Sequence, residues 1–256
     1  MKIATHILFF NQDKWILKNI EMIGPYVDKI YIGWSEFPWS YNPNAKGLFK
    51  NNSNIDILKQ SSFFNKIEVI KGNWNLDEDE RNSCLERARN DGMEYLFIID
   101  ADEFYNSDDI EKMITEIKNS PDYEYYLTPW ITYWKDFNHL IIDSAGDYIN
   151  GYPEVCINLK YSNKFIRCRK PSGTSIKKLS SVCNHVSYVL TDDECWSKIN
   201  TWGHAHQFNR NLWFSEKWIK WNESTINLHP ITPQAWYKAI KRPEIVKLPL
   251  ILNDLI

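Results

Sequence analysis

The first half of the chain alternates short apolar runs with amphipathic stretches. Four apolar runs predict β-strands, at residues 2–10, 27–32, 66–70 and 94–99. The stretches between and after them predict helices, the clearest of which carries apolar residues at positions i, i+3, i+4 and i+7: Ile110, Met113, Ile114 and Ile117. Strands that alternate with helices in this way predict a mostly parallel sheet with helices on both faces.

The second half has a different pattern. Further runs predict strands, several of them antiparallel, at residues 123–134, 153–159, 164–168 and 182–190. Residues 136–151 are rich in Asp, Gly and Asn and are expected to form a loop. Thr191 opens a Thr-x-x-Glu capping box, after which we expect helices up to the C-terminus. The predicted fold class is therefore α/β: a mostly parallel sheet flanked by helices, with a mixed antiparallel second half and C-terminal helices.

Composition narrows the class of protein. A net charge of -3 does not suggest nucleic acid or an anionic membrane as a partner. The five cysteines include no Cys-x-x-Cys pair, so we expect reduced thiols in a cytoplasmic protein. No run of 18 apolar residues predicts a transmembrane segment, although the aromatic C-terminal helices allow peripheral membrane contact. The 12 tryptophans, where they lie on loops, would suit stacking on sugar rings.

Two aspartates follow the fourth predicted strand, in Asp100-Ala101-Asp102-Glu103. Because alternate residues of an extended chain point the same way, Asp100 and Asp102 are expected to face one point. That point lies at the carboxyl end of the strand, where open α/β sheets bind ligands. Two carboxylates suit Mg²⁺ or Mn²⁺, which leave other positions to water and substrate phosphates. The alternative is an acidic loop that holds no ion.

Five features, taken in their order along the chain, resemble a known family of enzymes. They are a strand that ends at Asn11, a strand before Trp74, Arg81-Asn82 on a helix, Ile98-Ile99-Asp100-Ala101-Asp102-Glu103, and Asn184-His185-Val186-Ser187-Tyr188-Val189. This order resembles the nucleotide-sugar-dependent glycosyltransferases of the GT-A fold, especially family-2-type enzymes. The resemblance implies one GT-A-like, Rossmann-type catalytic domain over residues 1–215, with a nucleotide-binding half at about 1–120 and an acceptor half at about 121–215. Residues 216–256 would form a C-terminal helical extension.

The resemblance also implies roles for the acidic residues. Asp100 and Asp102 would hold Mn²⁺ or Mg²⁺ against the two phosphates of the donor, and His185 would complete the metal site. Arg81 would face the donor phosphates, or else pair with Asp77 or Glu78 on its own helix. The basic segment from Arg167 to Lys178 would bind phosphate or an anionic acceptor, although a solvated loop is the favoured interpretation.

The nucleotide of the donor is expected over the ends of the first three strands. Besides Arg81 and Asp100, the residues assigned to donor binding are Phe10, Asn11, Trp34 and Asn73.

An inverting transferase also needs a carboxylate base that takes the proton of the acceptor hydroxyl. The resemblance places this base in an acidic pair after the metal motif, and Asp192 and Asp193 have such a place. Aspartate in the first turn of a capped helix also has a purely structural explanation. Asp147 and Glu154, on a loop that leads into a strand, are the other candidates.

The expected function is a metal-dependent glycosyltransferase of the hexosyltransferase type in glycan biosynthesis. It would transfer a sugar from a nucleotide diphosphate donor, UDP-linked, to a hydroxyl of a glycan or glycoconjugate, with inversion. One alternative is a nucleotidyltransferase that forms nucleotide sugars, although no glycine lies between His6 and Lys14 for a phosphate loop. The other is an inactive carbohydrate-binding module, whose sugar binding would not depend on a metal.

Overall fold

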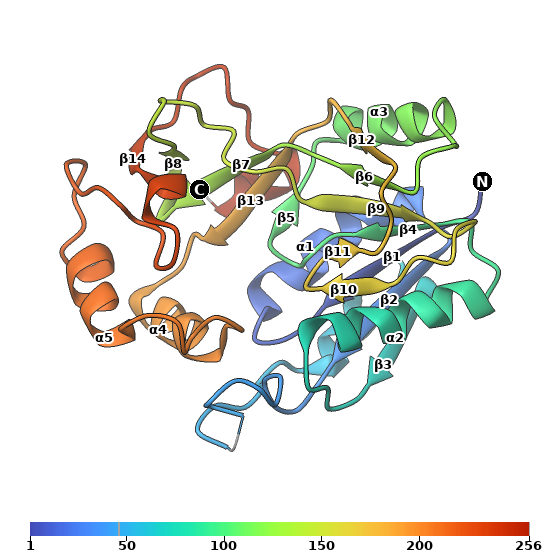
Figure 1. The fold of residues 1–256 in the computed structure, drawn as a ribbon, viewed down its shortest axis with the longest axis horizontal. Coiled ribbons are helices and arrows are strands. Elements are labelled where there is room, and N and C mark those ends of the chain that lie inside the picture. The colour runs from blue at the N-terminus through green and yellow to red at the C-terminus, as the bar shows by residue number, and fades with distance from the viewer. Residues whose placement is uncertain (46, 256) are drawn as a thin grey trace.

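A seven-stranded sheet organises the first half of the molecule (Figure 1). The computed structural model describes residues 1–45 and 47–255. The strand order is β12-β6-β9-β4-β1-β2-β3, and the last four of these run parallel to one another. They are β1 (Ile3–Leu8), β2 (Lys29–Trp34), β3 (Ile67–Lys71) and β4 (Tyr95–Ile98). The parallel sheet predicted from the four apolar runs is therefore confirmed.

Helices cover both faces of this sheet, as predicted. They are α1 (Asp13–Ile23), α2 (Asp77–Asn90) and α3 (Ser107–Lys118). Ile3 and Ile7 of β1 belong to the core that contains α1 and α3, whereas Ala4 packs with Leu85 and Ala88 of α2. Because β1 is covered on both sides, it reads as a continuous apolar run rather than an alternation.

Three more strands extend this sheet, one of which runs against the others, and further strands of mixed direction build a second sheet. The first sheet gains β6 (Tyr125–Leu127), β9 (Glu154–Asn158) and β12 (Ile176–Lys178), beside a hairpin of β10 (Phe165–Arg167) and β11 (Lys170–Pro171). The second sheet has the order β14-β8-β7-β13-β5. Its strands are β5 (Glu103–Phe104), β7 (Trp130–Trp134), β8 (Asp136–Ile142), β13 (Cys183–Tyr188) and β14 (Lys238–Lys241).

Two expectations about the second half are wrong. The single strand expected at 123–134 is divided at Pro129, which lacks the N–H that a continuous strand would need, into β6 and β7 of different sheets. The loop expected at 136–151 begins instead with β8, which follows β7 through a tight turn at Lys135 (φ 63°). The polar residues at the start of β8 made the whole segment resemble a loop, although its apolar end pairs with β7 and β14.

The C-terminal part is helical only in short segments. The predicted capping box is confirmed: Thr191 Oγ1 accepts from the Glu194 N–H at 3.2 Å, and α4 (Asp192–Thr201) follows. Then come α5 (Arg210–Trp213), a π-helical segment (Phe214–Ile219) and 3₁₀ turns at Pro233–Trp236 and Leu250–Leu255. Further 3₁₀ turns in the first half are Gly24–Tyr26, Ile55–Gln60 and Phe64–Lys66.

Much of the aromatic content is core rather than loop. Trp134 lies at the centre of a third apolar core, with Trp213, Trp218, Trp236 and Tyr188 around its ring. This core joins the second sheet to the C-terminal segments, so it positions α4 against β13. Those tryptophans therefore pack in the core and are not available to stack on a sugar ring.

Candidate functional site

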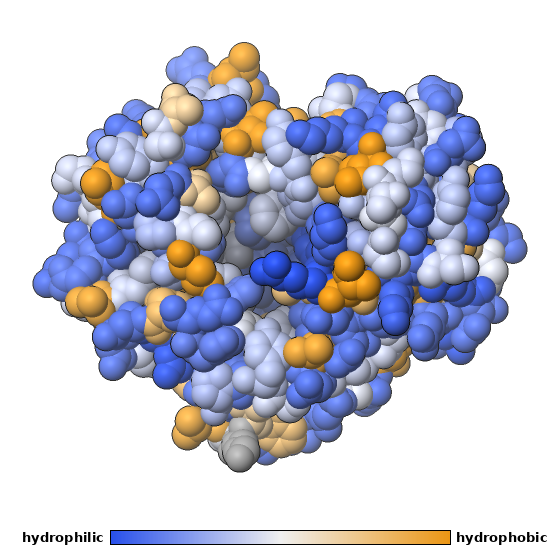
Figure 2. All heavy atoms as spheres, in the orientation of Figure 1, coloured by the Kyte–Doolittle hydropathy of each residue, from blue (hydrophilic) through white to orange (hydrophobic). Residues whose placement is uncertain are grey.

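The predicted acidic motif lies in a turn between the two sheets. Strand β4 ends at Ile98, and the Glu103 N–H donates to the Asp100 carbonyl at 3.0 Å, so residues 100–103 reverse the chain into β5. The expectation that Asp100 and Asp102 lie in extended chain is therefore wrong. The physical reason is topological, because β5 must pair antiparallel with β13 of the second sheet. Figure 2 shows a hollow in the middle of this face, between β13–α4 and the β10–β11 hairpin.

Asp100 is held by arginine from helix α2. Arg81 is almost fully buried, and its Nη1 and Nη2 donate to the two Asp100 oxygens at 3.0 and 3.1 Å. Its Nε also donates to Asp77 Oδ1 at 2.6 Å, which is the pairing along the helix that the sequence left open. Burial alone would raise the pKa of Asp100, but Arg81 and Arg169 outweigh it and hold that pKa well below its usual range.

A second buried arginine completes the surroundings of Asp100. Arg169, in the turn between β10 and β11, donates through Nη2 to the carbonyls of Ile98 and Glu154, both at 2.8 Å. Its Nη1 contacts Glu103 Oε1 and lies 3.4 Å from Asp100 Oδ2. The solvated loop expected for this basic segment is thus wrong at Arg169, which is 9% exposed. No sequence signal distinguished it from the neighbouring exposed basic residues.

Asp102 faces a different set of partners. Lys198 of α4 donates from Nζ to Asp102 Oδ2 at 3.0 Å and to Ser187 Oγ at 2.6 Å. The other Asp102 oxygen, Oδ1, lies 4.0 Å from His185 Nε2. His185 reaches this place because it pairs with Glu103 across β13 and β5. Burial raises the pKa of Asp102, but Lys198 and His185 lower it further than burial raises it.

The hydrogen bonds around His185 define its protonation. Thr132 Oγ1 donates its proton to Asn150 Oδ1 at 2.9 Å, so towards His185 Nδ1, at 3.4 Å, it accepts. With the hydroxyl hydrogen so assigned, Nδ1 carries the hydrogen of the neutral ring and Nε2 the lone pair. Burial lowers the pKa of His185 to about 4, which keeps the ring neutral at pH 7. The ring also stacks on Trp130 at a centroid distance of 4.1 Å, which fixes its plane.

Two acceptors, Asp102 Oδ1 and His185 Nε2, thus face each other. At 4.0 Å they are too far apart to share a proton directly. Two ligands of Mg²⁺ can lie up to ~4.2 Å apart, because each is about 2.1 Å from the ion. This pair therefore lies within reach of one divalent ion, whereas each Asp100 oxygen accepts from arginine. Within residues 1–45 and 47–255, no three His, Cys, Asp or Glu side chains are grouped to hold an ion. Further ligands would have to be water or substrate.

The residues assigned to the nucleotide lie at the ends of β1, β2 and β3. Trp34 is the last residue of β2, and its carbonyl accepts from the Gly72 N–H at the end of β3. Asn11 follows β1 with φ of 52°, and its side chain joins Lys50 and Asn52 of the loop after β2. Phe10 is half-buried and Asn73 exposed. The parallel strands therefore bring all four residues to the same edge of the sheet as Asp100.

The four candidate bases have different surroundings. Asp192 Oδ1 accepts from Trp218 Nε1 at 2.8 Å, and Asp147 lies on an exposed turn where its side chain caps the Ile149 N–H. Asp193 is exposed in the first turn of α4, the helix that carries Lys198. Glu154 begins β9, and its carbonyl accepts from Arg169. Asp192, Asp193 and Glu154 therefore belong to elements that touch the carboxylate cluster, whereas Asp147 does not.

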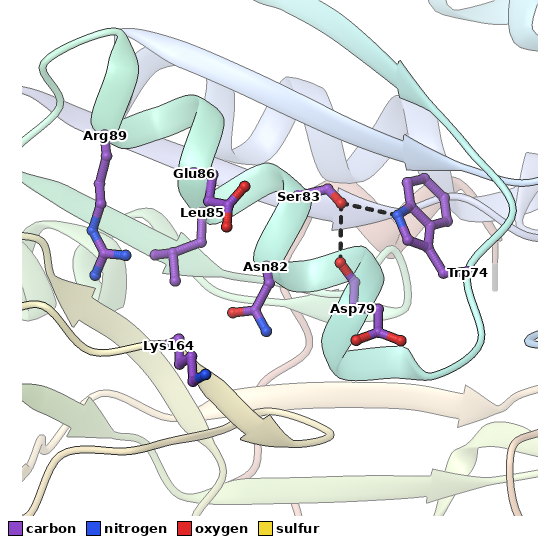
Figure 3. A pocket seen from close by; sticks show the side chains of 8 residues that line it. All are labelled: Trp74, Asp79, Asn82, Ser83, Leu85, Glu86, Arg89 and Lys164. Carbon is purple, nitrogen blue, oxygen red and sulfur yellow. Dashed lines mark hydrogen bonds between the residues drawn. The ribbon is translucent and has the colours of Figure 1, made fainter.

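A separate hollow of about 360 Å³ lies along the outer side of α2 (Figure 3). Its lining includes Trp74, Asn82, Arg89 and Lys164, and Trp74 Nε1 donates to Ser83 Oγ at 2.9 Å. None of the residues assigned from the sequence lines this hollow, so it is distinct from the carboxylate cluster.

The sequence model described as "Glycosyl transferase family 2" matches residues 52–180, which is half of the chain. The chain belongs to glycosyl transferase family 2. The predicted GT-A-type glycosyltransferase is thereby confirmed, and its family implies a nucleotide-sugar donor and a glycan acceptor. No curated protein matches the chain significantly. Among the described residues, no helix has the length and apolar character needed to cross a bilayer.

Several solved structures are similar to this glycosyltransferase. Residues 1–349 of TarS from S. aureus match at 11% identity and a TM-score of 0.42, over 86% of this chain and 76% of that one. The 4-diphosphocytidyl-2C-methyl-D-erythritol synthase of Anaerococcus prevotii matches at 12% identity and 0.41, over 77% and 94%. HddC from Yersinia pseudotuberculosis, complexed with GMP-PN, matches at 12% identity and 0.42, over 75% and 96%. These scores are too low to add to the family assignment.

Proposed function

We propose that this glycosyltransferase moves a sugar from a UDP-sugar to a hydroxyl of a glycan or glycoconjugate, with inversion and with help from Mn²⁺ or Mg²⁺. The observation that carries the metal dependence is the facing pair of acceptors, Asp102 Oδ1 and His185 Nε2, 4.0 Å apart. They lie beside the carboxyl ends of the parallel strands, where α/β sheets bind ligands.

Asp102 and His185 would hold the ion, which would supply charge neutralisation for the leaving diphosphate as a Lewis acid. Asp100, with Arg81 and Arg169, fixes the turn that presents Asp102. Donor binding over Phe10, Asn11, Trp34 and Asn73 would place the nucleotide along the same edge. This assignment keeps Asp102 and His185 from the expected metal set and gives Asp100 a positioning role.

The base would take the proton of the acceptor hydroxyl while that oxygen bonds to the anomeric carbon and the diphosphate leaves. Asp193 and Glu154 are the proposed candidates. The Trp218 hydrogen bond and the exposed turn give Asp192 and Asp147 structural explanations. Of D193N and E154Q, the variant that removes the base is expected to lower kcat by about 10²–10⁴.

The melting temperature with UDP, GDP, ADP or CDP tests this function. With Mn²⁺ present, UDP is expected to raise the melting temperature, because a ligand of the folded state stabilises it by mass action. EDTA should abolish most of that shift. If no nucleoside diphosphate raises the melting temperature in the presence of Mn²⁺, the donor-site proposal fails. A shift that is equally large in EDTA would contradict the proposed dependence on a metal ion.

A further inference from the structure

Lys198 already places a positive charge on the proposed ion site. Its Nζ lies 3.0 Å from Asp102 Oδ2 and 2.6 Å from Ser187 Oγ. A charge-assisted pair of this kind neutralises Asp102 in the free enzyme. The Lys198 side chain is 22% exposed, so it borders solvent and can leave Asp102 without unfolding its surroundings.

An ion on Asp102 would lie close to this ammonium. The ion would be about 2.1 Å from Oδ1, and Nζ is 3.0 Å from Oδ2 of the same carboxylate, so the two cations would be no more than ~7 Å apart. Two positive charges at this separation in a partly buried site repel strongly. They also compete for the electron density of one carboxylate. The ammonium therefore opposes binding of the ion, although the two would contact different oxygens of the carboxylate.

Lysine differs from the arginines beside Asp100 in how firmly it is held. Lys198 is a compact charge on a flexible four-carbon stem with two side-chain acceptors, Asp102 and Ser187. A diphosphate bound next to the ion would offer the displaced ammonium a new anionic partner. Binding of the ion and binding of the nucleotide would then support each other.

We propose that Lys198 is a built-in competitor for the ion, which lowers the affinity of Asp102 for the ion and makes ion binding depend on the nucleoside diphosphate. This inference rests on the proposed metal site at Asp102 and His185. It assigns to Lys198 a positioning role that no motif in the sequence predicted.

Calorimetric titration of Mn²⁺ into the whole protein, with and without UDP, tests the inference. Without UDP, the K198M variant is expected to bind Mn²⁺ about tenfold more tightly than the unmodified protein, because no ammonium at Asp102 opposes the ion. UDP should then strengthen Mn²⁺ binding more in the unmodified protein than in K198M. The matched control is K14M, since Lys14 also contacts α4, at Glu194, but lies away from Asp102. Its Mn²⁺ affinity should equal that of the unmodified protein.

Each outcome has a defined meaning. If K198M binds Mn²⁺ no more tightly than the unmodified protein, the competitor role is wrong while the metal site stands. If no variant binds Mn²⁺ with or without UDP, the metal site itself fails, and the competitor role fails with it.

S187A provides a second variant should K198M not fold. It removes the 2.6 Å contact of the ammonium and should raise Mn²⁺ affinity by a smaller factor, about threefold.

Discussion

Asp100 and Asp102 lie two residues apart in one turn, yet their surroundings are built differently. Asp100 receives a bidentate pair from Arg81 and a further contact from Arg169. Asp102 receives one ammonium, from Lys198, and otherwise faces the lone pair of His185 at 4.0 Å. Each oxygen of Asp100 accepts from a fixed arginine, whereas among the described residues no donor contacts Asp102 Oδ1.

The two carboxylates also differ in how firmly their partners are held. Both arginines are tied a second time, Arg81 to Asp77 and Arg169 to backbone carbonyls, so they cannot leave Asp100 without exposing further unpaired groups. Lys198 is held otherwise only by Ser187 Oγ and by the ring of Tyr188, 5.6 Å from its Nζ, among the described residues. An Asp-x-Asp motif therefore need not supply two metal ligands. In the assignment proposed above, its first aspartate stabilises the turn and its second would hold the ion.

The largest expected effect is the loss of stability on breaking the Asp100 side. R81M leaves Asp77 and Asp100 without their shared guanidinium, and removing one partner of a buried pair costs about 3–5 kcal/mol. Urea denaturation of R81M should show this as a lower free energy of unfolding. R87M is the matched control on the same helix: Arg87 is 46% exposed and pairs with Glu68 and Asp91, so its loss should cost under about 1 kcal/mol. Equal losses in the two variants would mean that the buried ion pairs of Arg81 contribute no more to the free energy of unfolding than the exposed pairs of Arg87.

The next largest effect concerns Glu80, one residue before Arg81. Burial and, to a smaller extent, the charge of Asp77 together raise the pKa of Glu80 to about 7, although the hydrogen bond from Trp39 Nε1 at 2.8 Å lowers it. The folded state therefore holds this proton more tightly than the unfolded state. The stability it contributes is present below pH 4.5 and is lost as pH rises through about 7, by roughly 3 kcal/mol in total.

The measurement is the difference in free energy of unfolding between the unmodified protein and E80Q, from pH 4.5 to 8. It should fall as pH rises, because Gln cannot titrate. E86Q, a change on the exposed side of α2, is the control for loss of a carboxylate. A difference that stays constant over this range would show that Glu80 titrates normally.

The elements that give the Asp100 side its rigidity were largely predictable from sequence. The four parallel strands, α2 with its acidic first turn, and the alternative pairing of Arg81 with Asp77 all follow from local periodicity and i, i+4 spacing. Such features depend on residues close in sequence. The capping box of α4 was predictable for the same reason.

The contacts that distinguish the two aspartates were not predictable, because they join distant segments. Arg169 meets Asp100 from 69 residues away and Lys198 meets Asp102 from 96 residues away. Nothing in the basic segment around Arg169 marks it as buried. The turn after Ile98 was missed as well, because a two-residue strand such as β5 has too little pattern to be recognised. Sequence therefore located the acidic motif but not the division of roles within it.

The third prediction tests that division at the ion. D102N should weaken Mn²⁺ binding in the presence of UDP by about 100-fold, because it replaces the charged oxygen that faces His185. D100N should change Mn²⁺ affinity by about threefold or less while lowering the melting temperature, since Asp100 faces arginine. Calorimetry and thermal denaturation of both variants give the four values. The reverse result, with D100N losing the ion and D102N keeping it, would exchange the two roles.

The smallest predicted effect concerns the histidine tautomer. Thr132 gives its proton to Asn150 and so accepts from His185 Nδ1, which leaves Nε2 free for the ion. T132V removes this acceptor and should weaken Mn²⁺ binding about tenfold, as losses of such supporting hydrogen bonds commonly do. T128V is the matched control, because Thr128 is equally buried and donates to the Ser181 carbonyl, away from His185. T128V should lose about 1 kcal/mol of stability but keep its Mn²⁺ affinity. Equal affinities in both variants would mean that Thr132 does not set the tautomer. The lone pair that faces Asp102 would then need another cause.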